Sequence, residues 1–133
     1  MKKISLALAV GAGATAAAVY YLTLPRQPEP AAGVTIPALS AAAMRGEAAF
    51  ARVCAECHGS SGEGTEGKGP PLLHQFYHPG HHGDAAFVAA VRQGARQHHW
   101  TYGDMKPVEG VSDADLMAII AFVREVQRAN GVF

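Results

Sequence analysis

The sequence predicts an all-α domain of three to four short helices joined by long loops. One apolar stripe at helical spacing follows the C-terminal part of the chain, through Leu116, Ile119, Ile120, Val123 and Val126. Helix-capping residues precede the segments that have a helical pattern. No segment alternates apolar and polar residues convincingly enough to predict a strand.

The first 24 residues predict a membrane segment. Two lysines are followed by an uncharged stretch from Ile4 to Leu24, and about 20 such residues can cross a bilayer as a helix. Two interpretations remain open, a retained signal anchor and a cleaved secretory signal with the small residues at 14–18 as its cleavage site. We favour an anchor, because it places Tyr20 and Tyr21 at the membrane interface, where aromatic residues are enriched. In either case the lysines stay in the cytoplasm, and the rest of the chain lies on the far side.

Residues 25–39 predict a linker. Four prolines between residues 25 and 37 favour extended chain over packed structure. At about 3.1 Å per residue, such a segment would hold a domain of residues 40–133 roughly 40 Å from the membrane.

The first helix of this domain is predicted from Ser40, its capping residue, to about Val53. We expect its buried face to include Met44, Ala48 and Ala51. The following segment, 59–83, is rich in glycine and proline and predicts a long loop.

Two more helices follow. Asp84 is predicted to cap a short helix that ends at Gly94. Ser112 and Asp115 resemble a capping box for the last helix, which carries the apolar stripe and ends at Asn130-Gly131.

Charge excludes one class of function. The chain has 11 Lys+Arg and 11 Asp+Glu, and no basic cluster suggests nucleic-acid binding. Without the two N-terminal lysines the remainder is mildly acidic. Partners are therefore expected to dock through an apolar or mixed rim rather than a ring of lysines.

The stretch Cys54-Ala55-Glu56-Cys57-His58 contains both cysteines of the chain. This pattern is typical of c-type haem attachment, because two thiols three residues apart can reach two vinyl groups of one porphyrin. The adjacent imidazole then lies beneath the iron. A Cys₄ zinc or iron–sulfur site would need two more thiols, a thioredoxin-like pair would need a βαβ setting, and a disulfide here would close too small a loop to stabilise much.

The chain resembles the class I cytochromes c, specifically small membrane-anchored bacterial ones, over about residues 40–130. The resemblance implies the cytochrome c fold around one covalent haem, with the first and last helices crossing where a glycine permits close approach. The features that carry it, in order, are Gly46 and Phe50, the Cys54–His58 motif, Gly69-Pro70-Pro71-Leu72, Met105 and the C-terminal amphipathic helix.

The resemblance also implies a ligand set. His58 is the expected proximal iron ligand, and the backbone carbonyl of Pro70 is the expected acceptor for its other ring N–H. Met105 is the expected distal ligand, although Lys106 stands where the family usually has a proline. Met44 and Met117 are expected to pack in the core.

Histidine is the alternative for the sixth position. His98 or His99 would give bis-histidine ligation and a lower redox potential. His81-His82 and His98-His99 could instead form a separate metal site, an interpretation that we rank lower because no carboxylate or cysteine accompanies them.

Two aromatic residues are candidates for contact with the haem. Trp100 and Tyr102 could donate hydrogen bonds to a propionate, or could pack against the porphyrin without one. Arg92 and Arg96 are weaker propionate candidates.

If His58 and Met105 both bind iron, no position is open for a substrate. The sequence therefore predicts an electron carrier rather than an enzyme: a membrane-tethered monohaem cytochrome in the bacterial inner membrane, with its haem domain in the periplasm. Its expected partners are a quinol-oxidising complex, a dehydrogenase or a terminal oxidase. The alternatives are a permanently bound haem subunit of a larger complex and, third, a haem peroxidase or gas sensor.

Overall fold

The computed structural model of the protein describes residues 19–20 and 33–133. In the second range the chain forms α2 (Ala41–Val53), α3 (Ala55–His58), the 3₁₀ helix η1 (Gln75–Tyr77), α4 (Asp84–Gln93) and α5 (Asp113–Ala129). β-Structure in the described ranges is limited to two isolated bridges, so the all-α prediction is confirmed.

The membrane prediction lies almost wholly outside the described residues. Among the helices that are described, none combines the length and the apolar character needed to cross a bilayer. The predicted linker is described only from residue 33. There Val34 and Ile36 pack against the core, and the backbone of Thr35 exchanges two hydrogen bonds with the Asn130 side chain. The last part of the expected linker thus packs against the domain at the C-terminal end of α5.

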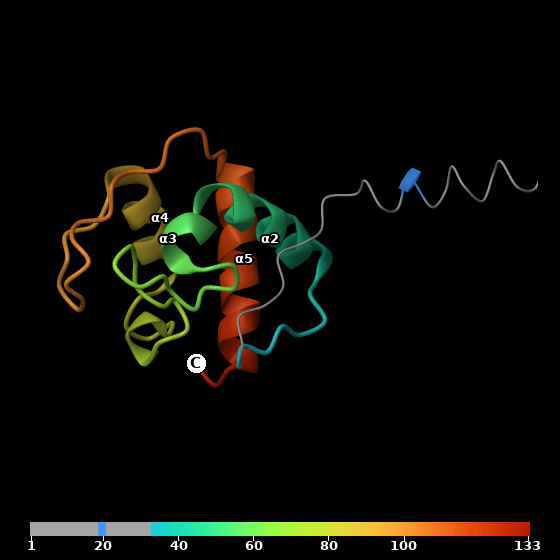
Figure 1. Ribbon diagram of the computed structural model, residues 1–133, viewed down its shortest axis with the longest axis horizontal. Coiled ribbons are helices and arrows are strands. Elements are labelled where there is room, and N and C mark those ends of the chain that lie inside the picture. Colours follow the sequence, from blue (N-terminus) through green and yellow to red (C-terminus); the bar gives the residue numbers. More distant parts are fainter. Residues whose placement is uncertain (1–18, 21–32) are drawn as a thin grey trace, which may run out of the picture.

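The crossing of α2 and α5 organises the core (Figure 1). Gly46 lies so close to α5 that a Cβ there would fall 1.9 Å from the carbonyl oxygen of Ala118. One turn further along α2, the Phe50 ring contacts the Phe122 ring at a centroid distance of 5.4 Å. The close approach that glycine allows therefore determines which face of α2 is buried.

The expected bounds of α2 are confirmed, but its expected buried face is wrong. Ser40 Oγ accepts a hydrogen bond from the Ala43 N–H, as a helix cap does. The buried residues are Ala43, Gly46, Ala49 and Phe50. Met44 is 54% exposed. It lies two residues before Gly46, and two residues of an α-helix correspond to a rotation of about 200°, so its side chain points away from α5.

The last helix follows the prediction closely. Ser112 Oγ accepts from the Asp115 N–H at 3.1 Å, and the whole apolar stripe is buried. Met117 is 55% exposed, so its expected core position is also wrong; it lies between Leu116 and Ala118 but outside the stripe.

α4 begins one residue earlier than expected. Gly83 is its N-cap, and Asp84 is the first helical residue. The Asp84 carboxylate accepts a hydrogen bond from Arg124 of α5 at 2.8 Å instead of capping its own helix. The expected stop at Gly94 is confirmed, with a φ of 77° that favours glycine.

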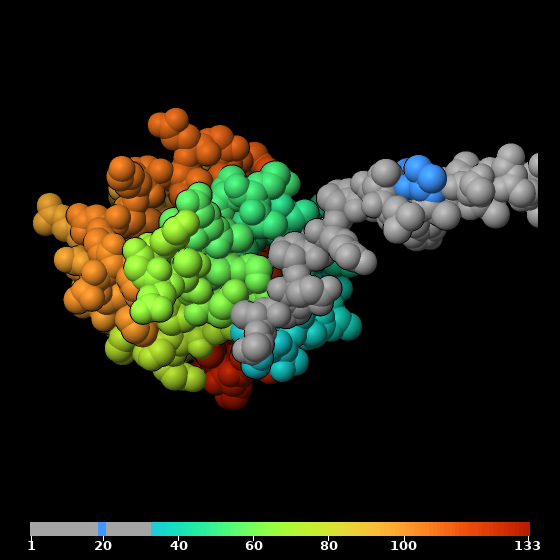
Figure 2. Space-filling model, in the orientation of Figure 1, coloured from blue at the N-terminus to red at the C-terminus, as the bar shows by residue number. Residues whose placement is uncertain are grey.

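Two long loops complete the domain on one side of α5, together with α4 (Figure 1). They comprise residues 59–83 and 94–112, and parts of them lie next to each other on the face shown in Figure 2. The space enclosed by these loops, α4 and α5 contains the candidate site.

Candidate functional site

A pocket of about 330 Å³ lies between the loops and helices, with mostly apolar walls. α5 contributes Leu116, Ile119 and Val123 to it, and α2 contributes Phe50. A large apolar pocket with a few polar groups is the usual form of a cofactor site. The residues with chemical functions that line it are Cys54, His58, Tyr77, His82, Arg96, His98, His99, Trp100, Tyr102 and Met105.

The two cysteines lie at the junction of α2 and α3. Cys54 lines the pocket, Cys57 is exposed, and no disulfide joins them. Burial, with a smaller contribution from Cys57, raises the pKa of the Cys54 thiol to about 11. A redox-active CxxC pair needs a lowered thiol pKa, so this environment does not fit thioredoxin-like chemistry.

His58, the last residue of α3, lies on the pocket wall. Its Nδ1 is 2.9 Å from the Pro70 carbonyl oxygen, the contact that the resemblance implies for a proximal ligand. A carbonyl only accepts, so Nδ1 carries the hydrogen and Nε2 is left with its lone pair. Burial lowers the pKa of His58, and the bond to Pro70 partly opposes this. The imidazole is thereby held neutral, as a metal ligand must be.

A glycine brings the Pro70 loop against α3. A Cβ on Gly69 would lie 2.7 Å from the carbonyl oxygen of Cys57. Only a residue without a side chain permits this approach, and the approach places Pro70 within reach of His58.

Met105 also lines the pocket. Two backbone hydrogen bonds with Ala95, of 3.0 and 2.8 Å, hold its position in the loop. The neighbouring Gly94 has positive φ, and a Cβ there would lie 2.5 Å from the Met105 carbonyl oxygen. Since Met44 and Met117 are exposed, Met105 is the one methionine of the described residues that lines the pocket.

Trp100 and Tyr102 both border the pocket. Ring contacts with His74 at 5.0 Å and Phe76 at 5.8 Å hold the indole. Its N–H is buried and donates to no acceptor of the described residues. Burial raises the pKa of the Tyr77 hydroxyl, and the nearby Trp100 indole opposes that rise. The indole N–H and the Tyr77 hydroxyl do not have the geometry of a hydrogen bond. A buried donor without a partner at a pocket wall fits an acceptor carried by a ligand.

The two arginine candidates separate in the structure. Arg92 donates to the Val111 carbonyl at 2.7 Å and to the Asp113 carboxylate at 2.6 Å, and it does not line the pocket. Its expected role as a propionate partner is therefore not supported by its position. Arg96 does line the pocket.

Two buried polar residues of α5 escaped the sequence analysis. Arg124, 7% exposed, donates to Asp84 and to the carbonyls of Tyr77 and His82. Gln127 donates to the Leu72 and Tyr77 carbonyls. Both hold the 59–83 loop that forms a wall of the pocket. Their spacing in the sequence could have indicated that they are buried. Each lies four residues after a member of the apolar stripe and therefore on the same face of the helix.

Four histidines gather at the edge of the pocket, and three of them, His82, His98 and His99, line it. Desolvation and the neighbouring imidazoles of His98, His82, His81 and His74 lower the pKa of His99.

These residues fit a haem. The apolar pocket adjoins two thiols, one imidazole with a free Nε2 lone pair, one thioether and one buried N–H donor without a partner in the described chain.

The family model described as Cytochrome c matches residues 43–127, more than half of the chain. Comparison with curated proteins and with solved structures gave no match. The family carries covalently attached haem c and transfers electrons, and Cys54 and Cys57 are the thiols that this chain offers for the attachment. The chain therefore belongs to the cytochrome c family, as a haem c protein that transfers electrons.

Proposed function

We propose that this protein is a membrane-tethered carrier of single electrons whose iron ligands are His58 and Met105. The observation that carries the proposal is that both side chains line one apolar pocket, with the His58 ring oriented by the Pro70 carbonyl. Haem, when bound, supplies one-electron chemistry at its iron.

Each residue of the site has a defined task. Cys54 and Cys57 would form the thioether bonds, and His58 would give its Nε2 lone pair to the iron while Nδ1–H donates to Pro70. That bond fixes the ring orientation and increases the basicity of the ligand. Met105 would give its thioether sulfur, which raises the potential relative to a second histidine.

The pocket walls support electron transfer in a second way. Phe50, Leu116 and Ile119 surround the site with apolar surface. An apolar shell limits the access of water and tunes the redox potential of a metal centre. If His58 and Met105 both held the iron, a substrate would find no open coordination site.

The tether and the partners rest on the sequence. An uncharged segment from Ile4 to Leu24 is long enough to anchor the chain, and an anchor raises the effective concentration of a carrier near membrane partners. Residues 33–39 meet the domain beside Asn130, beyond the α5 residues that line the pocket. We place the domain in the bacterial periplasm, with a quinol-oxidising complex, a dehydrogenase or a terminal oxidase as partners.

The ligand assignment is tested with Met105→Ala and with Met117→Ala as the control, since Met117 is exposed outside the pocket. We expect Met105→Ala to abolish the absorption bands of thioether ligation and to lower the reduction potential, because methionine ligation raises it. Visible and near-infrared spectra with a redox titration measure both. Unchanged bands in Met105→Ala would refute the assignment.

Bis-histidine ligation is the alternative that the structure favours specifically, because His98 and His99 also line the pocket. Spectra of His98→Ala and His99→Ala distinguish bis-histidine ligation from ligation by His58 and Met105. If either substitution changes the axial-ligand bands while Met105→Ala does not, the sixth ligand is that histidine. Rapid carbon monoxide binding by the reduced wild-type protein would instead indicate an open position, and thus a sensor or peroxidase.

The tether is tested separately from the ligands. Alkaline carbonate should leave the full-length chain in the membrane fraction, and N-terminal sequencing should find the first residues retained. Release of a shortened chain would show cleavage. Purification in mild detergent then distinguishes a free carrier from a permanent subunit, which would retain a stoichiometric partner.

A further inference from the structure

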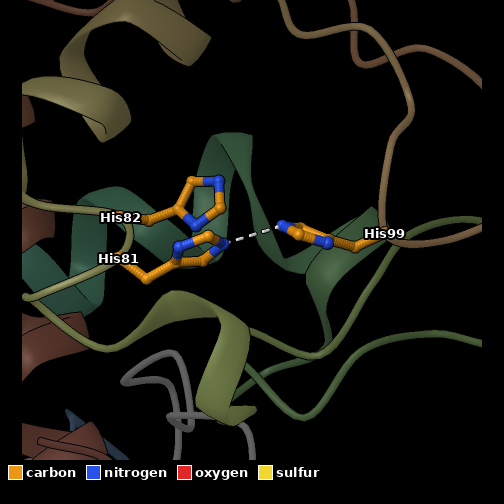
Figure 3. Close-up of side chains that lie close together, drawn as sticks. All are labelled: His81, His82 and His99. Atoms are coloured by element: carbon orange, nitrogen blue, oxygen red, sulfur yellow. Dashed lines mark hydrogen bonds between the residues drawn. The ribbon is translucent and has the colours of Figure 1, made fainter.

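Four imidazoles from two loops converge beside the pocket. His81 and His82 precede α4, and His98 and His99 belong to the 94–112 loop. His81 Nε2 lies 3.2 Å from His99 Nε2 (Figure 3). One ligand atom from each of His81, His82 and His99 lies within 4.8 Å of the other two.

The hydrogen bonds of two rings show which nitrogen is free. His82 Nδ1 is 2.6 Å from the Phe76 carbonyl oxygen, and His98 Nδ1 is 2.8 Å from that of Arg96. Because carbonyls only accept, both Nδ1 atoms carry hydrogen, and in the neutral rings both Nε2 atoms hold lone pairs. Donation of Nδ1–H to a carbonyl is also the usual outer contact of a metal-binding histidine.

These lone pairs face each other. His82 Nε2 lies 3.3 Å from His98 Nε2, so two acceptors stand in contact with no hydrogen of either neutral ring between them. Such a contact is favourable only if a cation or an added proton lies between the nitrogens. The separations of 3.2 and 3.3 Å are close to the roughly 3.3 Å between two nitrogens that are each about 2.0–2.1 Å from a tetrahedral ion.

We propose that His81, His82 and His99, completed by His98, bind a divalent transition-metal ion at the edge of the pocket. An all-imidazole set suits Zn²⁺ and Cu²⁺ and disfavours Mg²⁺ and Ca²⁺, which require oxygen ligands. The absence of a cysteine or carboxylate in the cluster is no obstacle, because three imidazoles can hold Zn²⁺. The sequence suggested this site only as a lower-ranked interpretation, whereas the fold brings the two histidine pairs into contact.

Neighbouring groups position the rings before any ion binds. The Phe76 ring stacks on His99 at a centroid distance of 4.2 Å, and the Phe76 carbonyl holds His82. Arg124 is not a ligand of the ion, but it holds the backbone at His82 by donating to the His82 carbonyl at 2.6 Å. The four proposed ligands do not include the expected iron ligands, His58 and Met105.

The test is calorimetric titration of Zn²⁺ into the haem-loaded protein. In this form Cys54 and Cys57 are bound to haem as thioethers and cannot compete for Zn²⁺, and the protein carries no polyhistidine tag. We expect one ion per chain. His82→Gln and His99→Gln should each weaken binding by about 100-fold or more, because even outer contacts of metal ligands contribute about 10 to 100-fold. His78→Gln is the matched control, since His78 lies in the same loop but outside the cluster, and it should bind as wild type.

Zinc X-ray absorption of the wild-type complex should show nitrogen ligands at about 2.0–2.1 Å. Titration by Cu²⁺ should show the same dependence on His82 and His99. No stoichiometric Zn²⁺ binding by the wild type, equal affinity in all three variants, or equal loss in His78→Gln would overturn the proposal. Because His98 and His99 are also the alternative iron ligands, the spectra of His98→Ala and His99→Ala distinguish a failure of this proposal from a failure of the Met105 assignment: the axial-ligand bands change only if one of these histidines binds the iron.

Discussion

The Trp100 indole N–H is buried at the pocket wall and donates no hydrogen bond to any acceptor of the described residues. In a folded protein such a donor costs free energy unless a ligand supplies the acceptor. A haem propionate is an acceptor of the required kind, and the negative charge would strengthen the bond. We therefore expect Trp100 to donate to a ligand in addition to its aromatic contacts with His74 and Phe76.

Trp100→Phe tests this role, because phenylalanine keeps an aromatic ring but has no N–H. We expect the free energy of unfolding of the haem-loaded protein to fall by about 1.5–3 kcal/mol, the contribution of a hydrogen bond to a charged group. Urea denaturation followed by haem absorbance measures it. Equal or greater stability of the variant would show that the indole packs without donating.

At the scale of the elements, the contact between α2 and α5 depends on one position. A Cβ at Gly46 would meet backbone atoms, not flexible side-chain ends: the Ala118 carbonyl oxygen at 1.9 Å and the Ile119 nitrogen at 2.9 Å. The helices would have to separate to accommodate even a methyl group. The Phe50–Phe122 contact one turn away would loosen with them.

Gly46→Ala is therefore expected to destabilise the protein, although alanine favours helix formation by about 1 kcal/mol over glycine. Overpacking should outweigh that gain and leave a net loss of about 1–3 kcal/mol in the free energy of unfolding. Chemical denaturation measures this. Arg45→Ala, an exposed neighbour on α2, should change stability by no more than about 0.5 kcal/mol; a Gly46→Ala value in that same range would contradict the packing argument.

A second contact between elements gives a pH dependence. Glu125 of α5 accepts from the Ser40 backbone N–H at 3.0 Å and from its hydroxyl at 2.7 Å. These bonds lower the pKa of Glu125 below its ordinary 4.5. A lowered folded-state pKa means that the bonds stabilise the protein above the ordinary pKa, and that this stabilisation is lost as the pH falls through the folded-state pKa.

Glu125→Gln should therefore reduce the free energy of unfolding at pH 7, by less than about 1 kcal/mol because the carboxylate is near the surface. The difference from wild type should shrink as the pH falls from 4.5 through the lowered folded-state pKa, where the wild-type carboxylate becomes protonated. Urea unfolding at neutral and acid pH measures it. Glu109→Gln, at an exposed loop position, is the control, and a difference that persists at acid pH would count against the charge effect.

At the scale of the whole molecule, Arg124 joins three parts of the chain. From α5, its guanidinium donates hydrogen bonds to Asp84 of α4 and to the Tyr77 and His82 carbonyls of the 59–83 loop. It also lies over the Phe87 ring, with its central carbon 4.7 Å from the ring centroid. This one side chain therefore holds α4 and the 59–83 loop, which forms a pocket wall and carries His82, against α5.

Arg124→Met keeps much of the side-chain volume and removes every donor. We expect a loss of about 1–3 kcal/mol in the free energy of unfolding, because the Gln127 side-chain oxygen and the part-buried Tyr77 and His82 carbonyls lose their donor. Thermal and urea unfolding of the haem-loaded protein measure it. Arg128→Met, one turn later and exposed, should be nearly neutral, and similar losses in the two variants would show that the buried network contributes little.

What the sequence determined by itself is local in origin. The spacing of Cys54, Cys57 and His58 indicates haem attachment, and the caps at Ser40 and Ser112 indicate where two helices begin, because these signals depend on residues a few positions apart. The apolar stripe of α5 was readable for the same reason.

The tertiary structure decided what depends on partners distant in the chain. Met44 and Met117 were expected in the core but are exposed, because helix periodicity does not state which face the other helix will cover. The polar Arg124 and Gln127 are buried because loop carbonyls far away in sequence satisfy them. The two histidine pairs likewise became one cluster only when the loops folded together, since periodicity and capping report neighbours along the chain and not across it.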